Sequence, residues 1–163
     1  GNLKTRTLGL VSSIAAGLAL ALPHRKVIAI DGDGAFLMNL CGLPTIALQS
    51  PPNLIHLLFD NGVYEASGGT ATASHVADAV SLAQGAGYPH ACWVETLGEF
   101  RAGFLEAWES NRLTLIAVKV EPGQPKDLPA LKLDELENKY LFMRHLERTE
   151  NKAILSPGFD SKI

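Results

Sequence analysis

The sequence predicts an α/β fold with a parallel sheet flanked by helices on both faces. Four short apolar runs, at 26–31, 54–60, 91–96 and 113–120, have the length and composition of strands buried on both faces. Segments with helical spacing separate these runs, and such alternation is typical of parallel sheets with right-handed crossovers. The chain has 163 residues, of which 47% are apolar and 19% charged, enough for one packed domain.

In the first half of the chain, two helices are expected beside two strands. Residues 10–22 are apolar around the whole helical circumference, which predicts a mostly buried helix before the strand at 26–31. Residues 36–48 have helical spacing, and Pro44 is expected in the first turn of that helix, where its missing N–H costs little.

The second half opens with a long segment that has no periodicity. Residues 61–74 are rich in Gly, Ser, Thr and Ala, and a loop of this length in a compact domain is usually functional or disordered. Helices are expected at 76–86 and 98–111, each before a strand. We therefore assign residues 1–123 to the main domain.

The remaining residues, 124–163, are expected to be a linker, a charged helix and a tail attached to the same domain. Prolines and a glycine in 122–129 predict the linker. Residues 131–148 have helical character and many charges, and 149–163 resemble a weakly ordered tail.

Charge and cysteine usage limit the possible functions. The net charge of -3 gives no basic surplus for nucleic acid. Cys41 and Cys92 are too few for a disulfide framework, which indicates a reducing compartment and a cytoplasmic protein. Residues 4–22 also resemble a secretory signal, although the apolar run is too short to span a membrane. The histidines are scattered without the spacing of zinc ligands.

The segment Gly32-Asp33-Gly34 follows the first predicted strand and is the strongest functional signal. Position 37 is Leu where a dinucleotide fingerprint needs Gly or Ala, and Phe36 stands where an EF-hand loop needs Gly. A plain strand-to-helix turn remains an alternative. Glycines would let a ligand approach the backbone, and the N–H groups that follow favour an anion such as phosphate.

A second polar pair follows the next strand. Twenty-five residues separate Gly34 from Asp60-Asn61, enough for one crossover helix and the adjacent strand. Because parallel strand ends frame the ligand crevice of such sheets, Asp33 and Asn61 can reach one ion. Their oxygens suit Mg²⁺ or Ca²⁺, so we expect a metal-bridged diphosphate site.

These residues resemble the thiamine-diphosphate-binding motif, a Gly-Asp-Gly followed some twenty-five residues later by two asparagines. Here the first asparagine is replaced by Asp60. The resemblance covers roughly residues 8–120. The segments 8–13, 60–64 and 67–69 further resemble the diphosphate-binding half of sulfopyruvate and phosphonopyruvate decarboxylases.

The resemblance implies specific roles for the site residues. Asp33, Asn61 and the carbonyl of Val63 would bind Mg²⁺, with thiamine diphosphate and water completing the shell. The residues expected to contact the cofactor are Leu8, Gly9, Gly32, Asp33, Gly34, Ala35, Asn61, Val63 and Tyr64. Leu8 would be the apolar wedge that bends the cofactor. Arg6 departs from the family, which has Gly at this position.

The glycine-rich loop is the expected substrate side of the site. The resemblance places Tyr64 and the candidates Glu65, Ser67 and Gly68 near the substrate, and an ordinary surface loop is the alternative. His75 is more simply read as a residue at the start of a helix.

The activating glutamate of the resembled enzymes lies on a separate pyrimidine-binding domain, for which this chain has no room. We therefore expect a partner subunit or domain to supply it, with the 8–22 helix and the glycine loop as candidate contacts in an oligomer. The predicted function is the diphosphate-binding part of a 2-oxoacid decarboxylase, a carbon–carbon lyase that is incomplete alone. The alternatives are an acetolactate synthase-like carboligase, a 2-oxoacid oxidoreductase subunit and a non-catalytic cofactor-binding module.

Overall fold

The computed structural model describes residues 1–123 and 134–155, which fall in two compact units. One unit is Thr7–Gln124, and the other combines Gly1–Arg6 with Pro125–Ile163. Each unit is described by itself. The assignment of 124–163 to the same domain as 1–123 stays a prediction.

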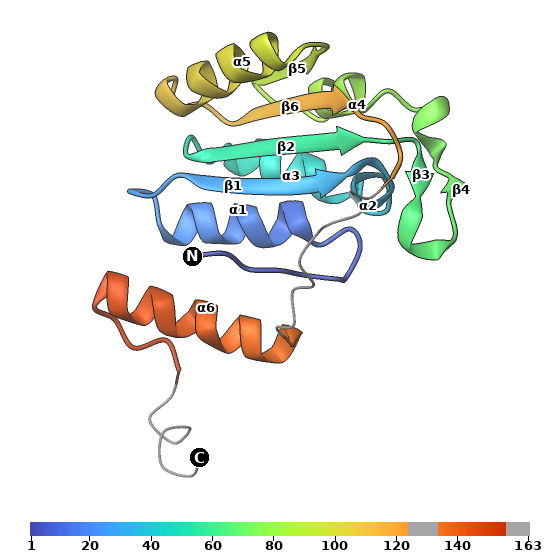
Figure 1. Ribbon diagram of the computed structural model, residues 1–163. Coiled ribbons are helices and arrows are strands. Elements are labelled where there is room, and N and C mark those ends of the chain that lie inside the picture. Colours follow the sequence, from blue (N-terminus) through green and yellow to red (C-terminus); the bar gives the residue numbers. More distant parts are fainter. Residues whose placement is uncertain (124–133, 156–163) are drawn as a thin grey trace. The chain divides into compact units, whose positions relative to one another are not determined.

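The larger unit is built on a four-stranded parallel sheet. Its strands are β1 (Val27–Gly32), β2 (Leu54–Asp60), β5 (His90–Val94) and β6 (Thr114–Lys119), in the order β1-β2-β6-β5. All three pairings are parallel. Figure 1 shows the arrowheads of β1, β2 and β6 at the same edge of the sheet, beside the short hairpin of β3 (Val63–Tyr64) and β4 (Thr70–Ala71).

Helices cover the sheet from both sides, as the sequence predicts. One core cluster joins the sheet to α1 (Val11–Ala21), α3 (Gly42–Gln49) and α4 (Ala79–Gly85). A smaller cluster on the other face includes Phe100, Phe104 and Ala107 of α5 (Leu97–Glu109). Side chains of a strand alternate between the two faces, so each central strand contributes to both clusters.

The register of β1 and β2 positions the polar residues that follow them. Gly32 of β1 pairs with Phe59 of β2 at the carboxyl end of the two strands. The residues that come next along each strand are Asp33 and Asp60. Adjacent strands lie about 4.8 Å apart. The expected meeting of the two strand ends is therefore present.

The helix expected at 36–48 is wrong as a single helix, because the structure has two. α2 (Asp33–Leu37) ends early, and α3 starts at Gly42 with Pro44 in its first turn, where proline was expected. Pro44 has no N–H to donate to the carbonyl of Leu40, so one continuous helix would lose a hydrogen bond there.

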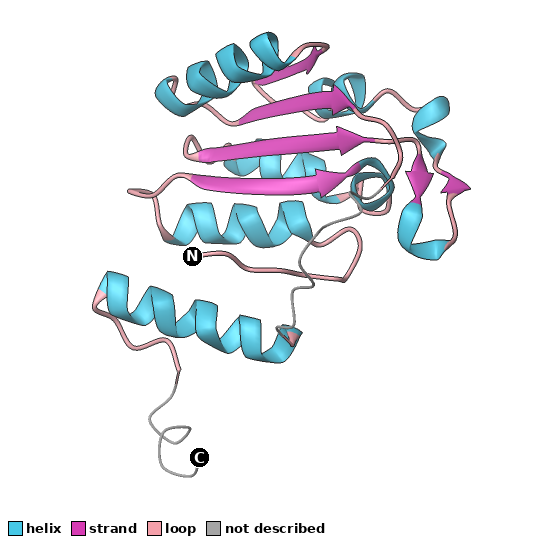
Figure 2. Cartoon of the chain, viewed as in Figure 1, coloured by secondary structure: helices cyan, strands magenta, loops and turns pink. Residues whose placement is uncertain are grey.

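The long segment at 61–74 contains local structure that the sequence pattern does not reveal. The hairpin holds the 3₁₀ turn η1 (Glu65–Ser67), and η2 (Ala73–His75) follows β4 (Figure 2). The next helix, α4, starts three residues later than predicted because Asp78 caps it, accepting a hydrogen bond from Ser81 N–H at 2.6 Å.

The expectation that the first strand is buried on both faces is wrong. Along β1, Ala29 and Asp31 are buried, whereas Ile28 and Ile30 are 40% and 65% exposed. β1 is an edge strand, and α5 packs on β5 and β6 at the other side of the sheet.

The second unit is described over 1–6 and 134–155 and contains α6 (Glu135–Glu150), capped by Asp134. The backbone of Lys4 donates to Asn138 at 2.7 Å, and Arg6 forms an ion pair with Glu135. Most of the predicted linker and tail lies outside the described residues. Over the described parts of the chain, none of the helices has both the length and the hydropathy needed to cross a membrane.

Candidate cofactor and metal site

Asp33 is the first residue of α2, and its side chain is buried at the carboxyl end of β1. It is 2% exposed, and its Oδ2 accepts a hydrogen bond from the Thr72 hydroxyl. Within residues 1–123 and 134–155, no Lys, Arg or His forms an ion pair with it. A buried carboxylate without a cation is costly, so this geometry fits a bound cation.

Asn61 directly follows β2, on the strand next to β1. Its Oδ1 accepts a hydrogen bond from Val63 N–H at 3.1 Å, which folds residues 61–63 into a tight turn. An amide oxygen can accept more than one interaction, so this turn leaves it able to bind a cation. The structure thus places Asn61 and Val63 together, on the strand end beside Asp33.

No ready-made protein cage for a metal surrounds these residues. In the part of the chain that the structure describes, no three His, Cys, Asp or Glu side chains gather as a metal site. Mg²⁺ typically uses one or two carboxylates together with phosphate oxygens and water. The donor set of Asp33 and Asn61 therefore fits Mg²⁺ held jointly with a phosphate ligand.

A hydrogen-bond network, which we call the edge network, continues from Asp33 across the sheet. The Thr72 hydroxyl lies 2.9 Å from that of Ser74, and the Ser74 hydroxyl donates to Asp60 Oδ1 at 3.0 Å. Asp60 is 2% exposed and also accepts from Gly62 N–H at 3.0 Å. Its Oδ2 forms an ion pair with Lys119 at the end of β6.

The structural requirement for glycine differs between the two glycine positions of the motif. A Cβ at Gly34 would overlap the ring of Tyr64, so the chain itself requires glycine there. A Cβ at Gly32 would meet only Phe59 O at 3.9 Å, an ordinary contact. The ring of Tyr64 thus packs closely against Gly34, whereas among the described residues no side chain fills the space beside Gly32.

Leu8, Gly9 and Ala35 lie close to the same elements. Gly9 has a φ of +85°, and its carbonyl accepts a hydrogen bond from Asn39 at 2.7 Å. Leu8 is 49% exposed just before α1, and Ala35 is buried in α2.

The substrate candidates occupy the hairpin between β3 and β4. The Glu65 carboxylate accepts a hydrogen bond from Gly123 N–H, which ties the hairpin to the segment after β6. Ser67 and Gly68 are exposed, and Gly68 has a φ of +90°, as the tight turn requires. Glu65 is thus engaged in holding the hairpin, whereas Ser67 and Gly68 are exposed and accessible to a ligand.

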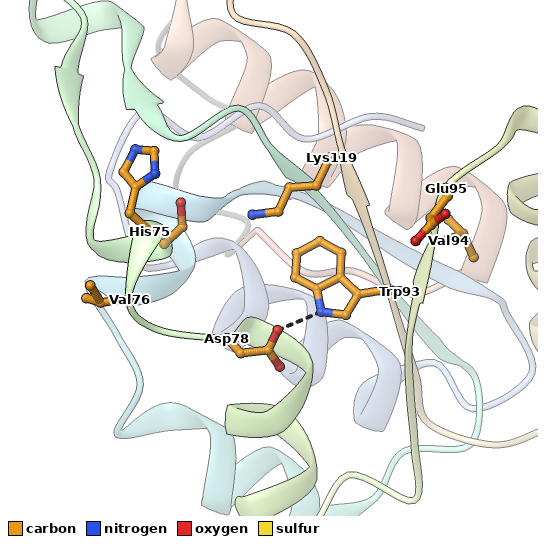
Figure 3. Close-up of a pocket in the computed structure, with 8 residues that line it drawn as sticks. His75, Val76, Asp78, Trp93, Val94, Glu95 and Lys119 are labelled. Carbon is orange, nitrogen blue, oxygen red and sulfur yellow. Dashed lines mark hydrogen bonds between the residues drawn. The ribbon is translucent and has the colours of Figure 1, made fainter.

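A pocket of about 620 Å³ lies beside the edge network, at the carboxyl ends of β5 and β6 (Figure 3). The Lys119 ammonium lies 4.8 Å from the centre of the Trp93 ring, whose Nε1 donates to Asp78 at 2.8 Å. Hydrogen bonds from Ser81 lower the pKa of Asp78. The lining residues are Ser74, His75, Val76, Asp78, Trp93, Val94, Glu95 and Lys119.

None of the predicted site residues lines this pocket. The prediction that His75 starts a helix is wrong, because His75 is the last residue of η2 and its Nε2 lies 3.2 Å from Gly62 O. The sequence did not identify Thr72, Ser74 or Lys119 as part of the site. The available signal was a charge at the end of each of two apolar strands, Asp60 on β2 and Lys119 on β6.

Comparison with known proteins identifies the family. Residues 4–118 match the family described as thiamine pyrophosphate enzyme, C-terminal TPP binding domain. The chain belongs to this family. The resemblance inferred from Gly32-Asp33-Gly34 and Asn61 is thereby confirmed.

Curated relatives in this family include decarboxylases. Sulfopyruvate decarboxylase subunit beta from Methanothermobacter thermautotrophicus is 38% identical over 131 residues, covering 80% of this chain and 67% of that protein. Phosphonopyruvate decarboxylase from Streptomyces hygroscopicus is 37% identical over 118 residues, covering 71% of this chain. The chain spans only 29% of that enzyme's length.

Solved structures show the same fold. The thiamine diphosphate-dependent 4-hydroxybenzoylformate decarboxylase of Rhodococcus jostii RHA1 aligns with a TM-score of 0.63 and 26% sequence identity. The match covers 72% of this chain and 24% of that enzyme. The predicted thiamine-diphosphate-binding fold is confirmed.

Proposed function

We propose that this chain is the diphosphate-binding part of a thiamine-diphosphate-dependent 2-oxoacid decarboxylase that acts on sulfopyruvate or phosphonopyruvate-like substrates. The observation that carries the proposal is the buried Asp33 carboxylate, which has no ion-pair partner in the described chain and lies beside the Asn61 turn. Relatives named sulfopyruvate and phosphonopyruvate decarboxylase support the reaction class.

Each site residue has a definite task in this proposal. The oxygens of Asp33 and Asn61 and the carbonyl of Val63 hold Mg²⁺, while the N–H groups of Gly34 and Ala35 bind the diphosphate. Thr72 donates to Asp33 and fixes the orientation of that carboxylate. When bound, thiamine diphosphate supplies the electron sink for decarboxylation.

The remaining candidates shape the surroundings of the cofactor. Leu8 and Gly9 form the apolar side of the site, and Tyr64 packs on Gly34 and keeps the hairpin against α2. Ser67 and Gly68 are positioned to contact substrate or partner, with Glu65 anchoring their hairpin. Thr72, which directly follows the hairpin, covers the Asp33 carboxylate, which is 2% exposed.

A pyrimidine-binding subunit or domain completes the enzyme and supplies the activating glutamate. Support comes from relatives named as a beta subunit and from the exposed leucines around α1, namely Leu8, Leu10 and Leu20. Both cysteines are unpaired in the structure, which supports our proposal of a cytoplasmic location.

Calorimetry on the purified chain tests the proposal. Thiamine diphosphate is titrated with Mg²⁺ present and again with EDTA, and binding that requires the metal is expected. The chain alone should not decarboxylate sulfopyruvate or phosphonopyruvate, and activity should appear on adding the partner that co-purifies from its native source. Turnover by the isolated chain, or absence of any metal-dependent binding, would contradict the proposal.

A further inference from the structure

Lys119 neutralises the second of two buried carboxylates that lie close together at the sheet edge. Asp33 directly follows β1 and Asp60 is the last residue of the adjacent β2, and only the hydroxyls of Thr72 and Ser74 separate them along the edge network. Both aspartates are 2% exposed. At short range and low local dielectric, two such charges repel strongly, and together they attract a divalent cation.

The charges of the edge network leave one carboxylate available. Lys119 pairs with Asp60, whereas Asp33 has only the Thr72 hydroxyl among its described contacts. The network as a whole therefore carries one uncompensated negative charge, located on Asp33. Asp60 would otherwise offer a carboxylate ligand one residue before the neutral amide of Asn61.

The Lys119 side chain is held in place from two sides. It is 64% exposed, so burial alone does not fix it, yet its ammonium pairs with Asp60 and lies 4.8 Å from the Trp93 ring (Figure 3). Trp93 is in turn fixed by its hydrogen bond to Asp78 at 2.8 Å. A cation–π contact together with an ion pair keeps a lysine in one position better than either does alone.

We propose that Lys119 is a positioning residue that prevents Asp60 from binding the metal and so keeps Asn61 as the ligand beside Asp33. With Asp60 occupied by Lys119, its oxygens accept from Gly62 N–H and the Ser74 hydroxyl and hold the 61–74 segment on the sheet edge. The inference rests on the proposed function, because it concerns the same cation.

The variant Lys119→Met tests this role through the affinity for bare metal. Without the ammonium, Asp60 and Asp33 form a pair of unneutralised carboxylates, so binding of Ca²⁺ or Mg²⁺ in the absence of cofactor should tighten by roughly tenfold. Binding of thiamine diphosphate with Mg²⁺ should weaken by roughly 10- to 100-fold, as for other residues that orient metal ligands. Isothermal calorimetry measures both.

Two further variants separate positioning from folding. In Asp60→Asn/Lys119→Met the amide retains an oxygen to accept from Gly62 N–H and Ser74, so both affinities should return close to those of the wild type. Lys26→Met is the matched control, because Lys26 contacts Asn111 at 3.1 Å at the amino end of the sheet. This control should leave both affinities unchanged.

The outcomes are distinct for the two proposals. Unchanged or weaker binding of bare metal by Lys119→Met would overturn the role of Lys119. The same conclusion would follow if Asp60→Asn/Lys119→Met still bound bare metal more tightly than the wild type. If the wild type shows no metal-dependent cofactor binding, the proposed function fails, but the bare-metal comparison still decides the role of Lys119. Melting temperatures measured without ligand identify any variant that has not folded.

Discussion

Two groups of buried polar side chains in the larger unit differ in how their polar atoms are satisfied. The first is the edge network that joins Asp33 to Lys119. The second, which we call the interior cluster, consists of Asp31, His56 and Tyr88, each at most 5% exposed. The two groups are close in sequence, since Asp31 precedes Asp33 by two residues.

The interior cluster leaves several polar atoms without hydrogen bonds. His56 Nε2 lies 3.4 Å from Asp31 Oδ2, within ion-pair distance, but no hydrogen bond joins them. Neither ring nitrogen of His56 nor the Tyr88 hydroxyl has a hydrogen-bond partner among the described residues. Burial, reinforced by the negative charge of Asp31, raises the pKa of Tyr88.

This difference shows that burial of a charged group does not by itself indicate a binding site. The edge network gives both of its carboxylates hydrogen-bonding partners, and its one unmatched charge lies at the carboxyl edge, where parallel sheets bind ligands. The interior cluster lies among core side chains, where its unpaired atoms cost stability. We therefore expect substitutions in the first to alter binding and substitutions in the second to alter stability.

The largest effect is expected for Asp33→Ala. Loss of the carboxylate should abolish Mg²⁺-dependent binding of thiamine diphosphate. The loss of affinity should exceed the roughly 100-fold that follows from substituting residues that only orient metal ligands. The fold should remain, because Asp33 lies at a strand end and its unpaired charge is itself unfavourable. Calorimetry and thermal melts measure the two properties. A variant that binds the cofactor as tightly as the parent would show that Asp33 is not a ligand.

A substantial loss of stability without a loss of binding is expected for His56→Leu. Leucine fills a similar space but removes the imidazole that lies 3.4 Å from the Asp31 carboxylate, so the free energy of unfolding should fall by about 1–3 kcal/mol. Urea denaturation measures this change. Adding Asp31→Asn should recover most of it. If His56→Leu instead weakened metal-dependent cofactor binding at unchanged stability, the division between the two groups would be wrong.

The smallest effect is expected for Tyr88→Phe, which removes a hydroxyl that has no hydrogen bond. The free energy of unfolding at neutral pH should rise by up to about 1 kcal/mol. The raised pKa predicts a pH dependence: above pH 10.0 the tyrosine ionises in the unfolded chain before it does so in the folded one. The wild type should therefore lose stability as the pH rises above 10, relative to Tyr88→Phe. Parallel stability profiles in the two proteins would contradict this.

The sequence by itself determined the fold class, the two strand ends and the family. Apolar runs such as 54–60 coincide with the strands, because a strand buried on both faces needs apolar side chains at nearly every position. Gly32-Asp33-Gly34 and Asn61 could be recognised because their spacing corresponds to one crossover unit. These signals are local, or depend on one regular connection.

Only the tertiary structure decided which residues support the site. Thr72 directly precedes η2, Ser74 lies in η2, and Lys119 is the last residue of β6, 59 residues after Asp60, so no local pattern relates them. The exposed side of β1 likewise depends on the position of β1 at the edge of the sheet. The break between α2 and α3 depends on a hydrogen bond that Pro44 cannot make. Periodicity records which side chains are apolar, whereas pairing of buried charges depends on which strands become neighbours.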